Sequence, residues 1–165
     1  MNTVMKKVVI IGCPGAGKST FARKLAAKTG LPLHYLDMIW HKADRTVVGR
    51  DEFDRQLDTF VKEDEWIIDG NYARTLPVRL AHCDTVFFFD LPLEVCIEGV
   101  KSRLGKERVD MPWVDSEIDP EFLQWILDFP RDVAPEIEHL LKVFDKTIIR
   151  FHSREETDKF LETLK

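Results

Sequence analysis

Short apolar runs alternate along this chain with longer segments whose apolar residues recur every three or four positions. The runs contain many β-branched and aromatic residues, as buried strands do. They cover residues 8–11, 33–36, 66–70, 85–89 and 147–151. Because strands that alternate with helices form parallel sheets covered on both faces, we predict an α/β protein. Its expected architecture is a three-layer α/β/α fold with a five-stranded parallel sheet.

The segments between these runs have helical periodicity. The first helix begins near Lys18 and is expected to end before Gly30, a typical C′ residue. Further helices are predicted from apolar positions within residues 53–61, 93–100, 122–129, 133–144 and 154–164. We expect Pro130 to end the helix before it, and residues 71–74 to form a loop.

The turn after the first apolar run matches the phosphate-binding pattern G-x-x-x-x-G-K-[ST]. Glycines let the backbone N–H groups curl around a phosphate, and the following helix N-terminus adds its partial positive charge. Lys18 is expected to reach the β- and γ-phosphates of ATP, and the Ser19 hydroxyl to bind Mg²⁺. The predicted nucleotide-binding residues of the loop are Gly12, Pro14, Gly15, Ala16, Gly17, Lys18, Ser19 and Thr20.

Length and composition limit the remaining classes of protein. A chain of 165 residues fits a single domain, residues 1–165, and no apolar run approaches the roughly 20 residues that span a bilayer. The apolar stretch near the N-terminus is too short for a signal peptide. Three scattered cysteines do not suggest a disulfide framework, so we expect a cytoplasmic protein. A net charge of −5 argues against direct nucleic-acid binding, and the lack of a long apolar run argues against a membrane partner.

A phosphate-binding loop alone does not identify an activity, because motors, switches and kinases share it. The sequence contains no N-K-x-D, T-K-x-D or D-x-x-G stretch, which disfavours a GTPase switch. It also has little room for the additional domains of a helicase or a motor.

The later motifs narrow the class. The loop motif, Asp69-Gly70 followed by Arg74, Asp90-Leu91-Pro92 and the arginine-containing residues 103–131 together resemble the adenylate kinase-like family of small P-loop kinases. More narrowly, residues 35–40, 66–72, 108–111 and 122–130 are similar to the bacterial "DNA topology modulation protein" branch of that family. The resemblance extends over nearly the whole chain.

The resemblance implies a P-loop NTPase fold with an acceptor-binding segment at about residues 38–64 and a short helical lid at about residues 104–130. It also implies ATP- and Mg²⁺-dependent transfer of the γ-phosphoryl group to a small-molecule acceptor. A nucleoside monophosphate is one candidate acceptor, and a hydroxyl-bearing metabolite is another. An ATP-binding regulatory or sensor protein with little transfer activity is the alternative from a different class.

Several charged residues are candidates for the chemistry. Asp69 ends the strand expected beside the loop strand, so it could hold a Mg²⁺-bound water; Asp90 is a rival, and a turn-capping role is the simpler reading. By the resemblance, Arg74 should face the acceptor or the transferring phosphoryl group, unless it forms a surface ion pair. Arg103, Arg108 and Arg131 are candidate lid arginines on the same grounds, although exposed helices often carry arginine.

The residues after the second apolar run leave a choice open. Asp37 is expected at the strand end, where it would accept the proton of a hydroxyl acceptor, position another acceptor, or only stabilise a turn. Trp40 and Tyr72 would stack on a base or sugar, or pack in the core or lid. Trp66, Trp113 and Trp125 are read as packing residues.

Overall fold

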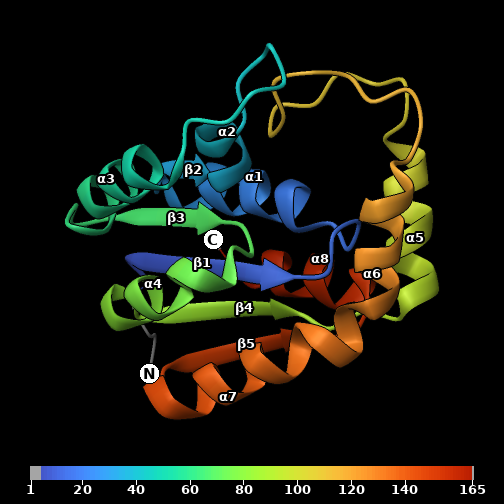
Figure 1. Ribbon diagram of the computed structural model, residues 1–165. Helices are drawn as coiled ribbons and strands as arrows, with labels where there is room; N and C mark the ends of the chain where they lie inside the picture. Colours follow the sequence, from blue (N-terminus) through green and yellow to red (C-terminus); the bar gives the residue numbers. More distant parts are fainter. Residues whose placement is uncertain (1–4, 165) are drawn as a thin grey trace.

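The computed structural model describes residues 5–164, which contain a five-stranded parallel sheet with strand order β2-β3-β1-β4-β5 (Figure 1). The strands are β1 (Lys7–Gly12), β2 (Leu33–Tyr35), β3 (Trp66–Asp69), β4 (Thr85–Phe89) and β5 (Thr147–Phe151). The central strand, β1, leads into the phosphate-binding loop and is paired with β3 and β4. The predicted α/β class and five-stranded parallel sheet are therefore confirmed.

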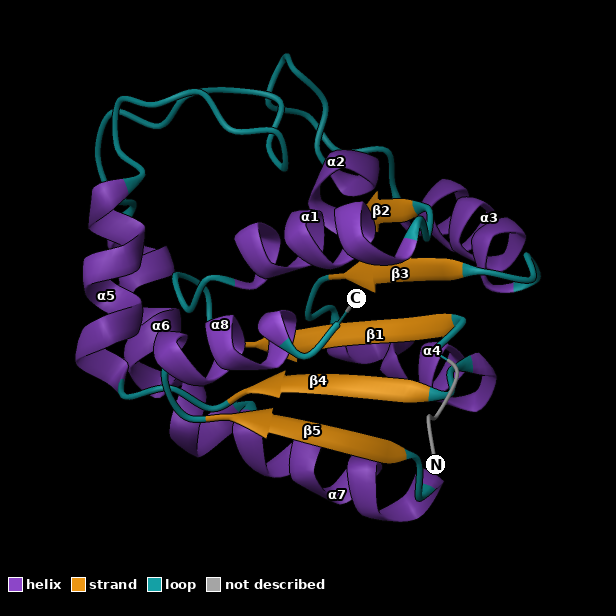
Figure 2. Cartoon of the chain, turned by 180° about the vertical axis from the view of Figure 1, so that it is seen from behind, coloured by secondary structure: helices purple, strands orange, loops and turns teal. Residues whose placement is uncertain are grey.

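Helices cover both faces of this sheet. They are α1 (Lys18–Thr29), α2 (Leu36–Trp40), α3 (Arg50–Val61), α4 (Leu76–His82), α5 (Leu93–Ser102), α6 (Pro120–Asp132), α7 (Ala134–Phe144) and α8 (Arg154–Glu162). Figures 1 and 2 show α1 and α8 on one face, and α4 and α7 on the other. Helices α5 and α6 stand at the end of the sheet where the strands terminate. None of the helices among residues 5–164 has the length and apolar character needed to cross a membrane.

Aromatic packing fixes α1 against the sheet. The Phe21 ring lies 4.9 Å from that of Phe87, 5.4 Å from Phe89 and 5.2 Å from Phe151, measured between centroids. These edge-to-face contacts add to the burial of large apolar surfaces. They hold the helix whose N-terminus carries the phosphate-binding loop.

Two boundaries differ from the sequence-based prediction. Strand β2 ends at Tyr35, so Asp37 lies in the first turn of α2 instead of at a strand end. Helix α6 continues through Pro130 to Asp132, and the expectation that it ends before the proline is wrong. Pro130 has no N–H to donate to the Ile126 carbonyl, but only two residues of the helix follow it, and the buried side chains of Ile126 and Phe129 secure this turn.

Helix α4 was not predicted. It follows a short 3₁₀ turn (Ala73–Thr75) and begins with a proline in its first turn, which suits the fixed proline backbone angle. Leu76 and Leu80 are buried one turn apart against the sheet. Seven residues are too few for a clear helical period, so tertiary packing decides this element.

The phosphate-binding loop and α5 approach each other at two glycines. A Cβ atom on Gly99 would overlap the carbonyl oxygen of Gly15, and one on Gly15 would overlap the carbonyl oxygen of Cys96. Gly15 also has a φ of +82°, in the region that side chains rarely adopt. The loop therefore rests directly on the backbone of α5.

This contact predicts that Gly99→Ala is destabilising, although alanine favours helices by about 1 kcal/mol over glycine. We expect a loss of about 1–3 kcal/mol in the free energy of unfolding, because the methyl group displaces the loop. Urea denaturation measures it, with Glu98→Ala on the exposed side of the same helix as the control. A Gly99→Ala variant at least as stable as the control would contradict the contact.

Candidate functional site

The phosphate-binding loop has the backbone conformation expected for a nest of N–H groups. Gly15 and Gly17 have φ values of +82° and +100°, and Gly17 directly precedes α1. A loop of this kind that opens a helix directs unpaired N–H groups and a partial positive charge to one point. Gly12 differs from the other predicted loop residues, because its lack of a side chain admits the backbone and Cβ of Phe89.

Two side chains from distant elements fix this loop. Asn71 accepts a hydrogen bond from the Gly12 N–H at 3.0 Å and donates one to the Gly12 carbonyl at 2.7 Å. Arg154 donates through Nη2 to the Gly15 carbonyl at 3.0 Å. The Gly12 and Gly15 carbonyls are thus occupied from outside the loop, while the Gly12 N–H donates to Asn71 and the Ala16 N–H to the Cys13 carbonyl. The remaining N–H groups at the start of α1 are available for an anion.

Lys18 and Asp69 are two buried residues of opposite charge at the centre of the site. Lys18 is 9% exposed and donates through Nζ to the Cys13 carbonyl at 3.2 Å. Burial lowers its pKa, and the negative charge of Asp69 opposes that shift. Asp69 is 8% exposed, and burial raises its pKa to about 7. Within residues 5–164, Asp69 Oδ1 has no hydrogen-bond partner, which is unusual for a buried carboxylate.

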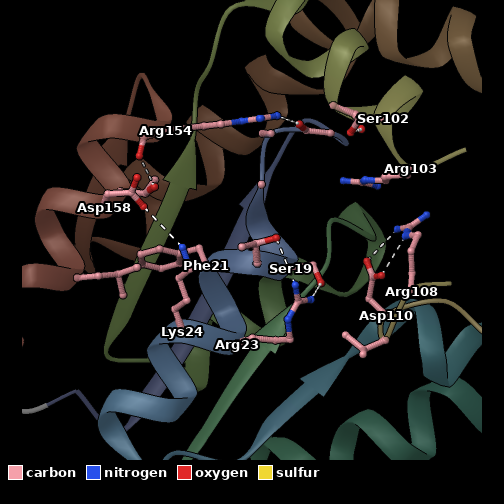
Figure 3. Close-up of a pocket in the computed structure, with 18 of the residues that line it drawn as sticks. Ser19, Phe21, Arg23, Lys24, Ser102, Arg103, Arg108, Asp110, Arg154 and Asp158 are labelled. Carbon is pink, nitrogen blue, oxygen red and sulfur yellow. Dashed lines mark hydrogen bonds and ion pairs between the residues drawn. The ribbon is translucent and has the colours of Figure 1, made fainter. Parts of the chain in front are cut away.

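Two hollows lie at this site, and Lys18 and Asp69 line the second of them. We call the first of two hollows the nucleotide cavity; it has a volume of about 500 Å³ and is drawn in Figure 3. It lies over the start of α1, between α5 and α8. Loop residues on its wall are Gly15, Ala16, Gly17, Ser19 and Thr20. Arg154 and Asp158 of α8 form the opposite wall.

The second hollow, the acceptor cavity, has a volume of about 700 Å³. It extends from the loop residues Pro14 and Lys18 across the ends of β2 and β3 to the lid segment. Asp37, Trp40, Asp69 and Tyr72 line its inner part, and residues of the segment 103–125 cover it. The predicted lid and acceptor-binding segments thus enclose one cavity between them.

The two cavities meet at Ser19, Arg103, Arg108 and Asp110, which line both. We call these four residues the phosphate junction. Arg108 donates through Nε and Nη2 to the Asp110 carboxylate at 3.0 and 2.8 Å. Among the described residues Arg103 has no side-chain hydrogen bond or ion pair, and Figure 3 shows it beside the Arg108–Asp110 pair.

The charge balance at the junction suits an anion. Burial lowers the pKa of Arg103, and the positive charge of Arg108 lowers it further. The pKa of the Asp110 carboxyl is also lowered, because the Arg108 bonds and charge outweigh the effect of burial. A half-buried guanidinium that lacks a partner and faces a second guanidinium gains most from a negatively charged ligand.

Asp37 lines the acceptor cavity and is held by a neighbour. The Tyr72 hydroxyl donates to Asp37 Oδ1 at 2.6 Å, and Tyr72 has a left-handed φ of +29°. Burial and the charge of Asp37 raise the pKa of Tyr72, so this tyrosine acts as a donor. Trp40 packs edge-on against Phe53, with centroids 5.6 Å apart, while it also lines the cavity. Both readings of Trp40, packing and ligand contact, are therefore compatible with its position.

The structure does not bring Arg74 and Arg131 to either cavity. Arg74 forms a two-bond ion pair with Asp54 of α3, at 3.0 and 2.7 Å, and its side chain is 43% exposed. Arg131 is 73% exposed and pairs with Asp128 and Asp132. Arg74 therefore forms the surface ion pair that was the alternative to a role at the acceptor. Arg131 is an exposed helix residue with acidic neighbours.

Four residues missed by the sequence analysis belong to this site: Asn71, Arg79, Asp110 and Arg154. Fully buried Arg79 donates to the carbonyls of Gly70, Asn71 and Tyr72, and so shapes the turn after β3. Arg154 is the first residue of α8, after the final strand. That position, at the carboxyl edge of the sheet, is the signal that could have identified it. Asp110 lies in an irregular segment and gave no such signal.

The donor set fits Mg²⁺ bound together with a nucleotide. Ser19 supplies a hydroxyl and Asp69 an orphaned buried carboxylate oxygen, and both are ligand types that Mg²⁺ prefers. In the described part of the chain no cluster of three His, Cys, Asp or Glu residues could hold a metal unaided. Mg²⁺ usually keeps waters and takes phosphate oxygens as further ligands, so two protein groups are sufficient. The rival, Asp90, instead accepts from Arg150 at 3.1 Å.

The raised pKa of Asp69 predicts a pH-dependent stability. Between its ordinary value of 3.8 and about 7, the folded chain keeps a proton that the unfolded chain has released. Stability therefore falls as the pH rises through this window and levels above it. Asp69→Asn removes this titration, so from pH 5 to pH 7 the variant should gain about 2–3 kcal/mol relative to the unmodified protein.

Denaturation with urea at several pH values tests this expectation, with Glu98→Gln as an exposed control. Parallel stability curves for Asp69→Asn and the unmodified protein would show that Asp69 titrates normally.

Comparison with known proteins supports the fold. No family model matches the sequence, and a search of curated proteins found no match. Shikimate kinase from Acinetobacter baumannii, solved with shikimate, is similar with a TM-score of 0.62 and 15% identity, covering 97% of this chain and 93% of that one.

Two further kinases give a similar result. A sugar kinase from a Janibacter species has a TM-score of 0.57 and 18% identity, over 97% of this chain and 92% of that one. A gluconokinase from Sinorhizobium meliloti has a TM-score of 0.58 and 13% identity, over 98% and 90% of the two chains. At these identities the likeness establishes the fold, and the narrower resemblance to the DNA topology modulation branch stays a prediction. The chain has the same fold as these three kinases.

Proposed function

We propose that this protein is an ATP- and Mg²⁺-dependent kinase that transfers the γ-phosphoryl group to a hydroxyl group of a small molecule. The observation that carries the proposal is the phosphate junction, where a cavity over the phosphate-binding loop meets a second cavity lined by Asp37. The similar folds of shikimate kinase, gluconokinase and a sugar kinase support it.

The loop and the cations around it perform the electrostatic part. The N–H groups of residues 15–20 and Lys18 hold the phosphates, while Arg103 and Arg108 neutralise the charge that spreads over the transferring oxygens. Mg²⁺, held through Ser19 and Asp69, supplies further charge neutralisation when bound. Little covalent chemistry is required of the protein, so positioning accounts for most of the catalysis.

Asp37 performs the acid–base part. Its Oδ1 accepts from Tyr72, which fixes the carboxylate and leaves Oδ2 free for an acceptor hydroxyl. In the transfer, the acceptor oxygen forms a bond to the γ-phosphorus as the bond from phosphorus to the β–γ bridging oxygen breaks. The hydroxyl proton passes to Asp37 and ADP leaves. The orientation of Arg74 toward Asp54 favours a hydroxyl acceptor over a nucleoside monophosphate, because the latter would need a cation to hold its phosphate.

A regulatory ATP sensor accounts less well for these observations. Such a protein needs a nucleotide site, but it does not need a second cavity that ends in a fixed carboxylate beside the phosphates. We therefore retain phosphotransfer as the proposed activity.

Removal of the Lys18 charge tests the role of the loop. Lys18→Ala should lower turnover by on the order of a hundredfold or more, because it removes a buried cation that stabilises developing charge. Transfer of labelled γ-phosphate to a set of hydroxyl compounds measures it, with Lys28→Ala at the exposed far end of α1 as the control. Equal turnover in both variants would reject the assignment.

The two kinds of arginine should behave differently. Arg108→Ala should lower turnover by roughly 10²–10³, as the loss of a transition-state donor does. Arg131→Ala should change it less than about threefold, because its side chain pairs at the surface and faces neither cavity. The same assay compares the two variants. A larger loss for Arg131→Ala would show that α6 moves into the site during turnover.

A further inference from the structure

The cations that line the acceptor cavity all lie at its phosphate end. They are Lys18, Arg103 and Arg108, and the proposed function assigns each of them to the nucleotide phosphates. His41 is the other basic side chain on the wall, and its ring lies edge-on to Trp113 at 5.0 Å. No fixed positive charge on this wall is thus left for the acceptor.

The acceptor cavity is also lined by carboxylates that lack a cationic partner among the described residues. Asp37, Glu117, Asp119 and Glu136 line it, and within residues 5–164 none of these four has an ion-pair partner. A fifth, Asp115, accepts from Trp113 Nε1 at 2.8 Å and lies 4.0 Å from the Arg45 guanidinium, which offsets its charge. An acceptor in this part of the cavity therefore meets a net negative field.

Flat aromatic faces accompany these carboxylates. Trp40 and Tyr72 line the cavity from the acceptor-binding side, and Trp113 and Trp125 from the lid side. Trp125 is parallel to Phe122, with an interplanar angle of 13° and a centroid distance of 6.2 Å. Such rings suit the apolar faces of a sugar or a heterocycle, and they attract cations.

We infer that the acceptor is a ring compound with a free hydroxyl group and without negative charge, either neutral or bearing an amine. This inference rests on the proposed function and specifies its substrate class. We call Glu117, Asp119 and Glu136 the acidic rim. A carboxylate or phosphate on the acceptor would face Asp37 and the acidic rim without a cation to pair with, in a partly desolvated space. The likeness to shikimate and gluconate kinases thus does not extend to anionic acceptors.

Matched acceptors that differ in charge test the inference. We would offer adenosine against adenosine monophosphate, and glucosamine and glucose against gluconate, and measure γ-phosphate transfer to each. The neutral or amine-bearing member of a pair should have a kcat/KM at least tenfold above that of the anionic member. A preference for the anionic member would overturn the inference but leave the kinase function intact.

Charge-removing variants separate electrostatics from shape. In Glu117→Gln/Glu136→Gln, the ratio of kcat/KM for anionic over amine-bearing acceptors should rise several-fold. Glu162→Gln on α8 lies outside the acceptor cavity and should leave the ratio unchanged. An unchanged ratio in the double variant would contradict a role for the acidic rim.

A measurement without any acceptor distinguishes failure of the inference from failure of the proposed function. Trp40, Trp113 and Trp125 line the acceptor cavity, whereas the remaining tryptophan, Trp66, is completely buried. At low ionic strength, the caesium quenching constant, divided by the caesium constant for free N-acetyltryptophanamide, should therefore exceed the iodide constant normalised in the same way. The double variant should narrow that difference.

A normalised iodide constant that equals or exceeds the normalised caesium constant would overturn the inference. If ATP binds but no compound accepts phosphate, the kinase function fails, and the quenching experiment alone decides the charge preference of the cavity.

Discussion

The carbonyl group of Gly15 is the point on which the site depends. It lies against Gly99 of α5 and accepts the Arg154 hydrogen bond from α8, so two elements distant in sequence define the course of one short loop. A flexible loop would lose conformational entropy each time it bound a phosphate. Because the folded chain has already fixed this loop, its N–H groups are preorganised for the anion. Asn71 has the same effect at Gly12, the start of the loop.

The second constraint is the concentration of charge in a region from which water is largely excluded. Lys18, Asp69 and Arg79 are all buried. Burial lowers the pKa of Lys18 and Arg79 and raises that of Asp69, so it favours the neutral form of each. The charges of Lys18 and Asp69 partly compensate each other, and Arg79 bonds to backbone carbonyls. Without a ligand, these buried charges are only partly compensated. A nucleotide with its bound metal would bring phosphate groups to the cations and a cation to Asp69.

Sequence patterns predicted the part of this molecule that local chemistry determines. Five apolar runs identified the sheet, and the loop motif identified Lys18 and Ser19, because periodicity and glycine spacing are local properties. The position of Arg74 was not predictable in this way, because its partner Asp54 lies 20 positions away on another helix. The acidic partners of Arg131, Asp128 and Asp132, are by contrast its neighbours in the sequence.

The lid segment and the acceptor-binding segment approach each other at the top of Figure 1, and residues of both line the acceptor cavity. The Arg45 guanidinium lies 5.0 Å from the Trp113 ring centroid, and it donates to the carbonyl of Val114, a residue 69 positions away in the chain. Two segments that lie far apart in the sequence therefore form the roof of the cavity together, and only non-covalent contacts join them there. Evolution toward a different substrate would require both segments to change together, since an altered residue on one side would lose its counterpart on the other.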